Sequence, residues 1–392
     1  MPSPIWALAV AIFAIGVDTY IVVGIVPEMA DDLGEPVAAV GLVASAYALP
    51  TALLAPVFGP LSDRRGRRLA MLIGLAIFIV AGAASAVAPS LPLLLLARGV
   101  NGLGAALILP AAFAYAGDIP KLEARNKAMG TLAAAFPLAT LLGLPFGALI
   151  ASVAGWRGAF VFIMLVGVAA FILVRALCPP DRPGTRRPLG YLASYRTILG
   201  DRSALKLLTV TFVWFIGPLG LFILLAEFIH VTYGIPTDQA GLFLLVVGVV
   251  GVVASRLSGR FMAVLGARKV VLIAISAFVV AATLMPLTTS ALPLTVLVMG
   301  LWAAGTWFGV PAMQAIMAAH SENLRGTMLA FNSSAFSLSG VIGPIIIGAI
   351  VAASGFSAAF WFAALLGGLA LLLAWIFLPK PVPIEAATEA AA

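Results

Sequence analysis

Long apolar stretches alternate with short polar ones along nearly the whole chain. A membrane-spanning helix needs roughly 20 apolar residues, because the hydrocarbon core is about 30 Å thick. When the stretches are divided at Gly, Pro and charged residues, the pattern predicts twelve such helices. The first stretch lacks the basic start and the short apolar core of a cleaved leader, so we expect it to remain as a span. The predicted bounds are 5–27, 38–61, 69–88, 91–117, 125–152, 157–178, 204–230, 238–258, 269–288, 292–319, 325–352 and 356–378.

Composition supports an all-α polytopic membrane protein. Of the 392 residues, 63% are hydrophobic and 9% are charged, whereas a soluble domain has about a quarter of its residues charged. These values exclude a soluble enzyme. Cys178 is the single cysteine, so no intramolecular disulfide forms, and two histidines with one cysteine are too few for a metal cluster. We therefore predict no cofactor and no bound metal.

The basic residues predict the orientation of the chain. With the N-terminus in the cytoplasm, all 22 Lys and Arg residues fall on the cytoplasmic side except Arg98, within a span, and Arg157, outside. The positive-inside rule therefore predicts that both termini are cytoplasmic. We expect the protein to lie in a bacterial-type inner membrane. Topology accounts for the net charge of +7, so the charge does not call for a nucleic-acid partner.

The sequence repeats itself at an offset of 200 residues in three separated regions. With six spans in each half, the two halves have the same orientation in the membrane. We predict two pseudo-symmetric six-helix bundles at 1–178 and 204–379, a cytoplasmic linker at 179–203 with a short interfacial helix near 189–199, and a tail at 380–392. The matched positions include Pro36 and Pro236, Gly59 and Gly259, Gly66 and Gly266, Arg68 and Arg268, Gly155 and Gly355, and Phe160 and Phe360.

The loop after the second span reads Gly-Pro-Leu-Ser-Asp-Arg-Arg-Gly-Arg-Arg over 59–68. It resembles the signature loop of the major facilitator superfamily. The resemblance implies that Asp63 bonds the backbone N–H groups at the cytoplasmic end of span 11, and that Arg67 meets Asp118 at the end of span 4. A loop that only sets topology explains the arginines but not Asp63 or the glycines. The resemblance implies a conformational latch made of Gly59, Asp63, Arg64, Gly66, Arg67 and Asp118, which is weaker in the second half because Ala263 replaces the acid.

Two further segments are similar to motifs of that family. Span 4 carries Arg-Gly-Val-Asn-Gly-Leu-Gly over 98–104, and span 5 carries Gly143, Pro145 and Gly147. The second of these looks like the motif of proton-driven exporters, although small residues at this spacing allow close helix approach in any membrane bundle. Together the three motifs imply the twelve-span drug:proton antiporter branch, near the sugar and drug efflux permeases.

Charged residues within the spans are candidates for proton coupling, because charge inside a membrane is costly unless it is paired or hydrated. Asp18 and Arg98 lie at similar depths, about 13 and 10 Å from the outer face. We expect Asp18 to carry the proton and Arg98 to pair with it; the alternative is a static ion pair that holds spans 1 and 4 together. Glu227 and His230 share a helical face near the outer end of span 7. They form either a second proton site, an outer gate or a solvated pair.

A cavity for amphipathic ligands needs aromatic walls and a few polar groups. For any single aromatic residue here, packing against lipid or another helix is the competing explanation. Amides facing lipid are costly, so the polar members are the stronger candidates. The substrate-binding candidates are Tyr20, Tyr47, Asn101, Tyr115 and Phe136 in the first half, and Trp214, Phe222, Trp307, Gln314, Asn332 and Phe336 in the second.

These observations predict a secondary transporter, not an enzyme. We expect a monomer that exports a small organic or amphipathic compound in exchange for protons by alternating access between its two halves. Proton-coupled uptake by the same fold is the main alternative. A membrane enzyme would need a catalytic cluster that the sequence lacks. A non-transporting receptor would have little reason to keep Asp18 and Arg98 at matched depth.

Overall fold

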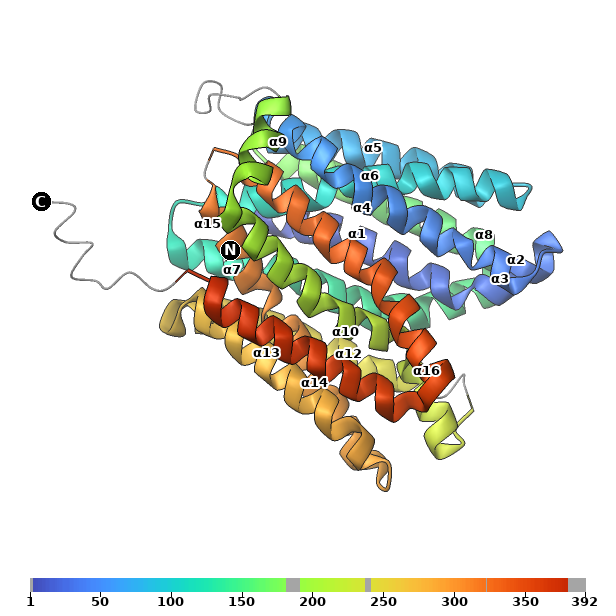
Figure 1. Cartoon of the computed structure of the whole chain (residues 1–392). Helices are drawn as coiled ribbons and strands as arrows, with labels where there is room; N and C mark the ends of the chain where they lie inside the picture. The colour runs from blue at the N-terminus through green and yellow to red at the C-terminus, as the bar shows by residue number, and fades with distance from the viewer. Residues whose placement is uncertain (1–2, 181–190, 237–240, 322, 380–392) are drawn as a thin grey trace, which may run out of the picture.

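The computed structural model describes residues 3–180, 191–236, 241–321 and 323–379, which form helices joined by short turns and contain no strand. Figure 1 shows the long helices lying side by side along roughly one direction. Two predicted segments, the tail at 380–392 and the linker residues 181–190, lie outside the described residues.

The first half of the chain contains eight helices among its described residues. α1 and α2 meet at Ile25, and α7 and α8 meet at Ala134. α8 bends at Gly155, where φ is 68°. The bounds are α1 Ser3–Gly24, α2 Val26–Leu33, α3 Val37–Val40, α4 Leu42–Arg65, α5 Arg67–Ala86, α6 Leu91–Gly117, α7 Leu122–Ala133 and α8 Ala135–Leu177.

The second half follows a short linker helix, α9. Its span 10 is divided at Phe308 and Gly309 into α14 and α15, and α16 bends at Gly355, where φ is 79°. The bounds are α9 Tyr191–Gly200, α10 Arg202–Tyr233, η1 Gly241–Phe243, α12 Leu244–Leu265, α13 Ala267–Leu284, η2 Met285–Thr288, α14 Leu292–Trp307, α15 Val310–His320 and α16 Arg325–Phe377.

Ten helices of the described chain are long and apolar enough to cross a membrane. α16 is one of the ten, although its bend at Gly355 divides it into the predicted spans 11 and 12. α7 and the first part of α8 correspond to the predicted span 125–152. The all-α polytopic architecture is therefore confirmed, with bends and short breaks where the sequence predicted separate helices.

Two predicted spans begin and end too early. The span predicted at 38–61 is α4 at Leu42–Arg65, because the apolar residues just before it form the separate short helix α3. The span predicted at 238–258 is α12 at Leu244–Leu265. Gly66 and Gly266, with φ of 98° and 79°, end these two helices in backbone conformations that favour glycine.

The repeat seen in the sequence is present in the backbone. All six glycines with positive φ in the described chain form pairs 200 residues apart: Gly34 with Gly234, Gly66 with Gly266, and Gly155 with Gly355. Side chains repeat too. Arg68 donates to the carbonyl of Arg175, and Arg268 donates to the carbonyl of Trp375, both at 2.6 Å.

The two ends of the helix bundle differ. We call the end where α4 joins α5 and α6 joins α7 the basic end, because Arg64, Arg65, Lys121 and Arg125 lie in or beside those turns. Figure 1 places the N-terminus, α7, α9 and α15 there, and α2 and α3 at the opposite, far end.

The linker helix α9 contacts both halves at the basic end. The hydroxyl of Tyr195 donates to the carbonyl of Pro56 in α4 at 2.9 Å. Its ring meets the ring of Phe331 in α16 edge to face, with centroids 6.0 Å apart. The short helix predicted near 189–199 is therefore present, and it packs between the halves.

Candidate functional site

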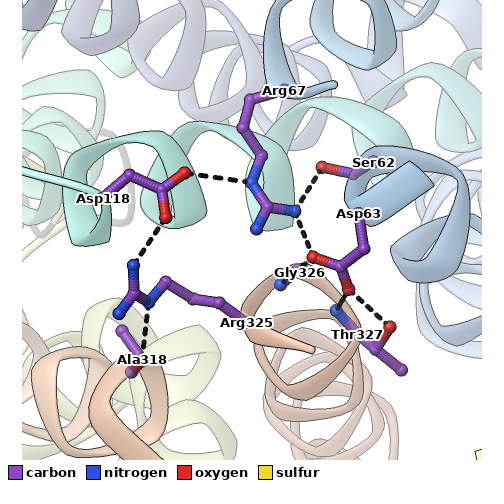
Figure 2. A network of polar contacts seen from close by, with 8 residues as sticks. All are labelled: Ser62, Asp63, Arg67, Asp118, Ala318, Arg325, Gly326 and Thr327. Atoms are coloured by element: carbon purple, nitrogen blue, oxygen red, sulfur yellow. Dashed lines mark hydrogen bonds and ion pairs between the residues drawn. The ribbon is translucent and has the colours of Figure 1, made fainter. Parts of the chain in front are cut away.

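The carboxylate of Asp63 joins the two halves at the basic end (Figure 2). Asp63 lies in the last turn of α4. Its two oxygens accept from the backbone N–H of Gly326 at 2.9 Å and from the backbone N–H and hydroxyl of Thr327, both at 2.7 Å. These N–H groups belong to the first turn of α16, where helix geometry leaves them unsatisfied and favours an anion. The geometry that the family resemblance implied for Asp63 is present.

Arg67 ties this carboxylate to a second one. Its guanidinium is fully buried and bonds Asp63, the hydroxyl of Ser62 at 3.1 Å and Asp118 at 3.4 Å. Asp118 also pairs with Arg325 of α16, whose Nε donates to the carbonyl of Ala318 at 2.7 Å. Two carboxylates and two guanidiniums from both halves thus form one network (Figure 2).

Sequence reasoning had treated Arg325 only as a topological charge and did not single out Thr327. The signal available for Arg325 was its position at the start of span 11, opposite an acid already expected at the same end. Of the remaining predicted latch residues, Arg64 is exposed at the end of α4. Gly59 lets α4 approach α16 closely, because a Cβ there would lie 2.7 Å from the Cα of Thr327.

The second copy of this interface keeps the close approach but only one of the four charges, since Arg125 is the counterpart of Arg325. A Cβ on Gly259 of α12 would lie 2.8 Å from the carbonyl oxygen of Asn126 in α7, so the helices are as close as on the first side. The positions 200 residues after the three charged residues Asp63, Arg67 and Asp118 are all alanine, namely Ala263, Ala267 and Ala318.

A second ion pair lies within the spans of the first half. Arg98 of α6 donates to Asp18 of α1 at 2.6 Å, and the amide of Asn101 donates to the other carboxylate oxygen at 3.1 Å. The side chains of Asp18 and Arg98 are 0% and 1% exposed. A buried pair of this kind is held by its partners, because either charge alone would be strongly destabilising. The structure thus brings together the two charges predicted at matched depth.

Aromatic rings surround this pair. The Arg98 guanidinium lies 4.6 Å from the ring centroid of Tyr47 and 5.7 Å from that of Phe160. Tyr47 of α4 and Asn101 were both predicted to bind substrate, but here their nearest role is to enclose the ion pair. The buried Tyr47 hydroxyl, Arg98 Nε and Asn101 Oδ1 have no hydrogen-bond partner among the described residues. Buried polar atoms without partners are uncommon, so these atoms mark a place where a partner can be gained.

The predicted span-5 motif lies beside Asp18. Gly143 and Gly147 of α8 pack against Tyr20 and Ile21 of α1. The small residues therefore let α8 lie close to the helix that carries the buried acid. The side chain of Pro145 lies outside the described residues.

A chain of neutral polar side chains crosses the second half. The hydroxyl of Thr211 in α10 donates to Asn332 Oδ1 in α16 at 2.8 Å, and Asn332 Nδ2 donates to Gln314 Oε1 in α15 at 3.2 Å. The structure thus brings the two predicted amides together. Sequence reasoning missed Thr211, because hydroxyl residues are frequent in these spans and nothing marks this one.

Two aromatic pairs link the halves. Tyr20 of α1 meets Phe222 of α10 edge to face at 5.6 Å, and Phe136 of α8 stacks on Trp307 of α14 at 6.3 Å. Four predicted substrate residues therefore lie where the halves face each other.

The other predicted aromatics lie elsewhere. Trp214 is fully buried against Phe215, which also packs on Phe336 at 4.7 Å. Tyr115 of α6 is partly buried. Helix packing therefore accounts for the position of Trp214, because its ring is closed off on all sides.

Glu227 and His230 are not brought together. Glu227 is exposed near the far end of α10, and His230 Nδ1 lies 2.7 Å from the carbonyl of Ile235. Among the described residues, no hydrogen bond or ion pair joins the two side chains. The geometry agrees best with the solvated alternative.

At the far end, α2 is bound to the bend of α8. Glu28 accepts from the backbone N–H of Trp156 at 3.1 Å, and Asp32 accepts from the Trp156 indole at 3.1 Å and pairs with Arg157. Hydrogen bonds from Arg157 and Trp156 hold the pKa of Asp32 below its ordinary value. In the second half the equivalent positions are Phe228 and Phe356, whose rings pack at 5.5 Å.

Solved structures with the same architecture are membrane transporters. The human organic anion transporter MFSD10 (TETRAN) matches with a TM-score of 0.79 at 21% identity, covering 95% of this chain and 98% of that one. The proton:xylose symporter XylE matches with a TM-score of 0.79 at 18% identity, covering 96% and 95%. At these identities the likeness shows the fold, with its two pseudo-symmetric six-helix bundles.

Relatives of this chain include bacterial transporters along its full length. The MFS-type transporter YtbD of Bacillus subtilis (strain 168) is 28% identical over 381 residues, which cover 94% of each chain. The inner membrane transport protein YdhP of Escherichia coli (strain K12) is 26% identical over 387 residues, covering 95% of each. The chloramphenicol resistance protein of Streptomyces lividans is 32% identical over 178 residues, covering 45% of each.

The family model of the Major Facilitator Superfamily matches residues 8–309 and 239–392, which together cover nearly the whole chain. The motif loop at 59–68, the buried pair of Asp18 and Arg98 and the fold of this chain agree with this match. The chain therefore belongs to the Major Facilitator Superfamily and is a membrane transporter, not an enzyme.

Proposed function

We propose that this transporter exports a small organic compound in exchange for protons by alternating access. The observation that carries the proposal is the fully buried ion pair between Asp18 and Arg98. In a bacterial inner membrane the positive-inside rule would put the basic end in the cytoplasm, with both termini. The inner membrane location of the E. coli relative YdhP supports this placement.

Asp18 is the proposed proton carrier. When it is ionised, it is held by Arg98 and by the amide of Asn101. A proton on Asp18 cancels the attraction to Arg98, so the buried guanidinium then needs another partner. Opening of the site to water on one side provides one. Protonation is thereby linked to a change in which side of the membrane reaches the site.

The network around Asp63 provides the second requirement, a closure that can be made and broken. Its carboxylate crosses from α4 to the start of α16, so the two halves cannot separate at the basic end while these hydrogen bonds exist. Rocking of the halves would break the contacts at this end and open a path to the cytoplasm. The same network thus favours the state that is open at the far end.

Export is proposed over uptake for two reasons. The span-5 motif resembles that of proton-driven exporters, and its glycines Gly143 and Gly147 pack against α1. The Streptomyces lividans relative is a chloramphenicol resistance protein, and resistance to an antibiotic is consistent with its removal from the cell. We therefore place chloramphenicol among the first compounds to test.

The test uses the purified full chain in proteoliposomes with a pH-sensitive dye inside. The wild-type protein should move protons against the direction of the transported compound when that compound is added. Asp18→Asn should abolish substrate-dependent proton movement, whereas Glu227→Gln, which changes an exposed acid of α10, should leave it intact. Normal gradient-driven transport by Asp18→Asn would refute the role of Asp18. Movement of protons and compound in the same direction would identify an uptake symporter instead.

A further inference from the structure

The hydrogen bonds of the second-half polar chain have one direction. Thr211 has a hydroxyl that donates to Asn332 Oδ1, which leaves the Asn332 amide nitrogen as the donor to Gln314 Oε1. A primary amide has one oxygen and one NH₂ group. Because the Gln314 oxygen is already used, its NH₂ group faces away from the chain. Each bond polarises the next, so the chain strengthens this arrangement.

The Gln314 NH₂ group has no acceptor among the described residues. Gln314 is partly exposed, whereas Asn332 behind it is buried. Its helix, α15, packs against α6 and α7 of the first half as well as α16 of its own. Gln314 therefore belongs to a helix that lies at the boundary between the halves, where a transported compound has to pass.

Among the described residues, the carboxylates that reach the ends of α15 and α16 are already paired with basic side chains: Asp63 with Arg67, Asp118 with Arg325 and Asp201 with His320. α15 and α16 contain no acidic residue, and the acid in α10, Glu227, lies about four turns beyond Thr211. Across the boundary, Asp18 is enclosed by Arg98 and Asn101. A cationic compound would find no carboxylate here to replace the water it loses, and burying an unpaired charge is expensive.

Aromatic surface lies near the same boundary. Trp307 stacks on Phe136 across it and precedes Gln314 by about two turns. A flat aromatic compound can take the place of one ring in such a stack.

We propose that Gln314 donates a hydrogen bond to the transported compound, and that this compound is an uncharged aromatic molecule with an oxygen acceptor such as a carbonyl or nitro group. The proposal rests on the proposed transport function for its context. Thr211 and Asn332 act as positioning residues, which fix the Gln314 amide so that its donors face outward.

The experiment measures equilibrium binding to the purified full chain in detergent, where no proton gradient exists. The probes are a library of N-phenylbenzamides, each made as the neutral amide, as the 4-trimethylammonio cation and as the 4-carboxylate anion. The wild-type protein should bind neutral members and should bind their charged forms more weakly. A failure of this binding proposal is distinguishable from a failure of the proposed transport function. The role of Asp18 is tested by proton flux, whereas the binding experiment involves no proton flux.

Variants separate the donor from the fold. Gln314→Leu should weaken neutral binding about tenfold, the loss of one good hydrogen bond. Thr211→Val keeps the shape but frees the Asn332 amide to turn, and should weaken it about threefold. Gln314→Glu replaces the donors with a carboxylate and should shift preference toward the trimethylammonio form, a change that a purely structural role would not produce. Ser339→Ala, which removes a buried hydroxyl of α16 bonded to the carbonyls of Phe212 and Ala335, is the matched control and should bind as wild type.

Three results would overturn the proposal. They are a wild-type preference for the charged forms, no binding of any neutral member, and wild-type binding by Gln314→Leu. Thermal unfolding of each variant shows whether weak binding is caused by misfolding. Gln314→Glu provides a second check, because a misfolded protein would not gain affinity for the cation.

Discussion

The two halves of this transporter have the same backbone register but are held at the basic end by different forces. Both halves approach through a glycine, Gly59 on one side and Gly259 on the other. Only the first interface adds a carboxylate, Asp63, which bonds the start of the opposite helix. The second has Ala263 in that place. Close approach is therefore a property of the repeat, whereas electrostatic closure was built on one copy only.

The far end shows the same division. Glu28 and Asp32 bind the bend of α8 through Trp156 and Arg157 in the first half. In the second half, Phe228 packs against Phe356 at 5.5 Å and Phe360 at 4.9 Å. At the far end the first half therefore uses charge and the second uses apolar packing, whereas at the basic end the second half has an ion pair of its own between His320 and Asp201. The far end of the first half should therefore respond to pH and salt, and the far end of the second should not.

The largest effect is expected from Asp63→Ala, which gives the first interface the residue of the second. It leaves Arg67 buried with one carboxylate fewer, and we expect the free energy of unfolding to fall by about 3–5 kcal/mol. Transport should be lost, because the basic end no longer closes. Thermal unfolding and proteoliposome transport measure the two effects. Ala263→Asp is the control. It should not raise the free energy of unfolding, since Ala267 offers no cation to the new carboxylate. Wild-type stability of Asp63→Ala would show that the two interfaces are equivalent.

Phe228→Leu tests the apolar side of the comparison. Two ring pairs are lost while an apolar side chain remains, so the free energy of unfolding should fall by about 1–2 kcal/mol. The size of this fall should be the same at low and high salt, as measured by thermal unfolding. A strong salt dependence would contradict the apolar account of the second half.

Acidification should loosen the far end of the first half alone. The folded-state pKa of Asp32 is lowered. Its stabilising contribution to the folded state is therefore complete when the pH is above the unfolded-state pKa of about 3.9. That contribution is lost as the pH falls through the lower folded-state pKa. Hydrogen exchange at residues 156–160 should rise in that acidic range, and exchange at 356–360 should not. Asp32→Asn should have this faster exchange already at neutral pH, with the added pH response reduced. Equal responses of the two segments would end the distinction.

The smallest effects are expected where the halves agree. Arg68→Ala and Arg268→Ala each remove an exposed hydrogen bond to a carbonyl, at 2.6 Å in both halves. Each should lower the free energy of unfolding by about 0.5 kcal/mol. Paired thermal melts measure the difference between them. A clear inequality would mean that the shared register hides unequal roles here as well.

Much of the fold could be predicted because long apolar helices leave a strong signal. The span predicted at 91–117 has the observed bounds of α6, Leu91–Gly117. Boundaries failed where apolar residues continue past a turn: nothing in 37–40 separates the short helix α3 from the span that follows. The bend at Gly355, by contrast, lies between the two spans predicted at 325–352 and 356–378, so this division agrees with the prediction.

The candidate site was predictable where a residue type is rare. A carboxylate and a guanidinium inside spans stand out, so Asp18 and Arg98 were found. Arg325 was missed because its partner, Asp118, lies 207 residues away in the chain and basic residues at span ends are common. Thr211 was missed because its partner, Asn332, lies 121 residues away in the chain and hydroxyl residues are common in the spans. Its importance depends on Asn332, which only the packing of α10 against α16 reveals.

The buried ion pair has an electrical consequence. With Asp18 ionised, the pair with Arg98 has no net charge. A proton carried on Asp18 would leave one positive charge inside the membrane. A membrane voltage acts on a charge that crosses it fully with about 2.3 kcal/mol per 100 mV. The same carboxylate would then make the transport cycle respond to voltage as well as to the proton gradient. Both would act on the one step in which protonated Asp18 changes the side of the membrane to which it is open.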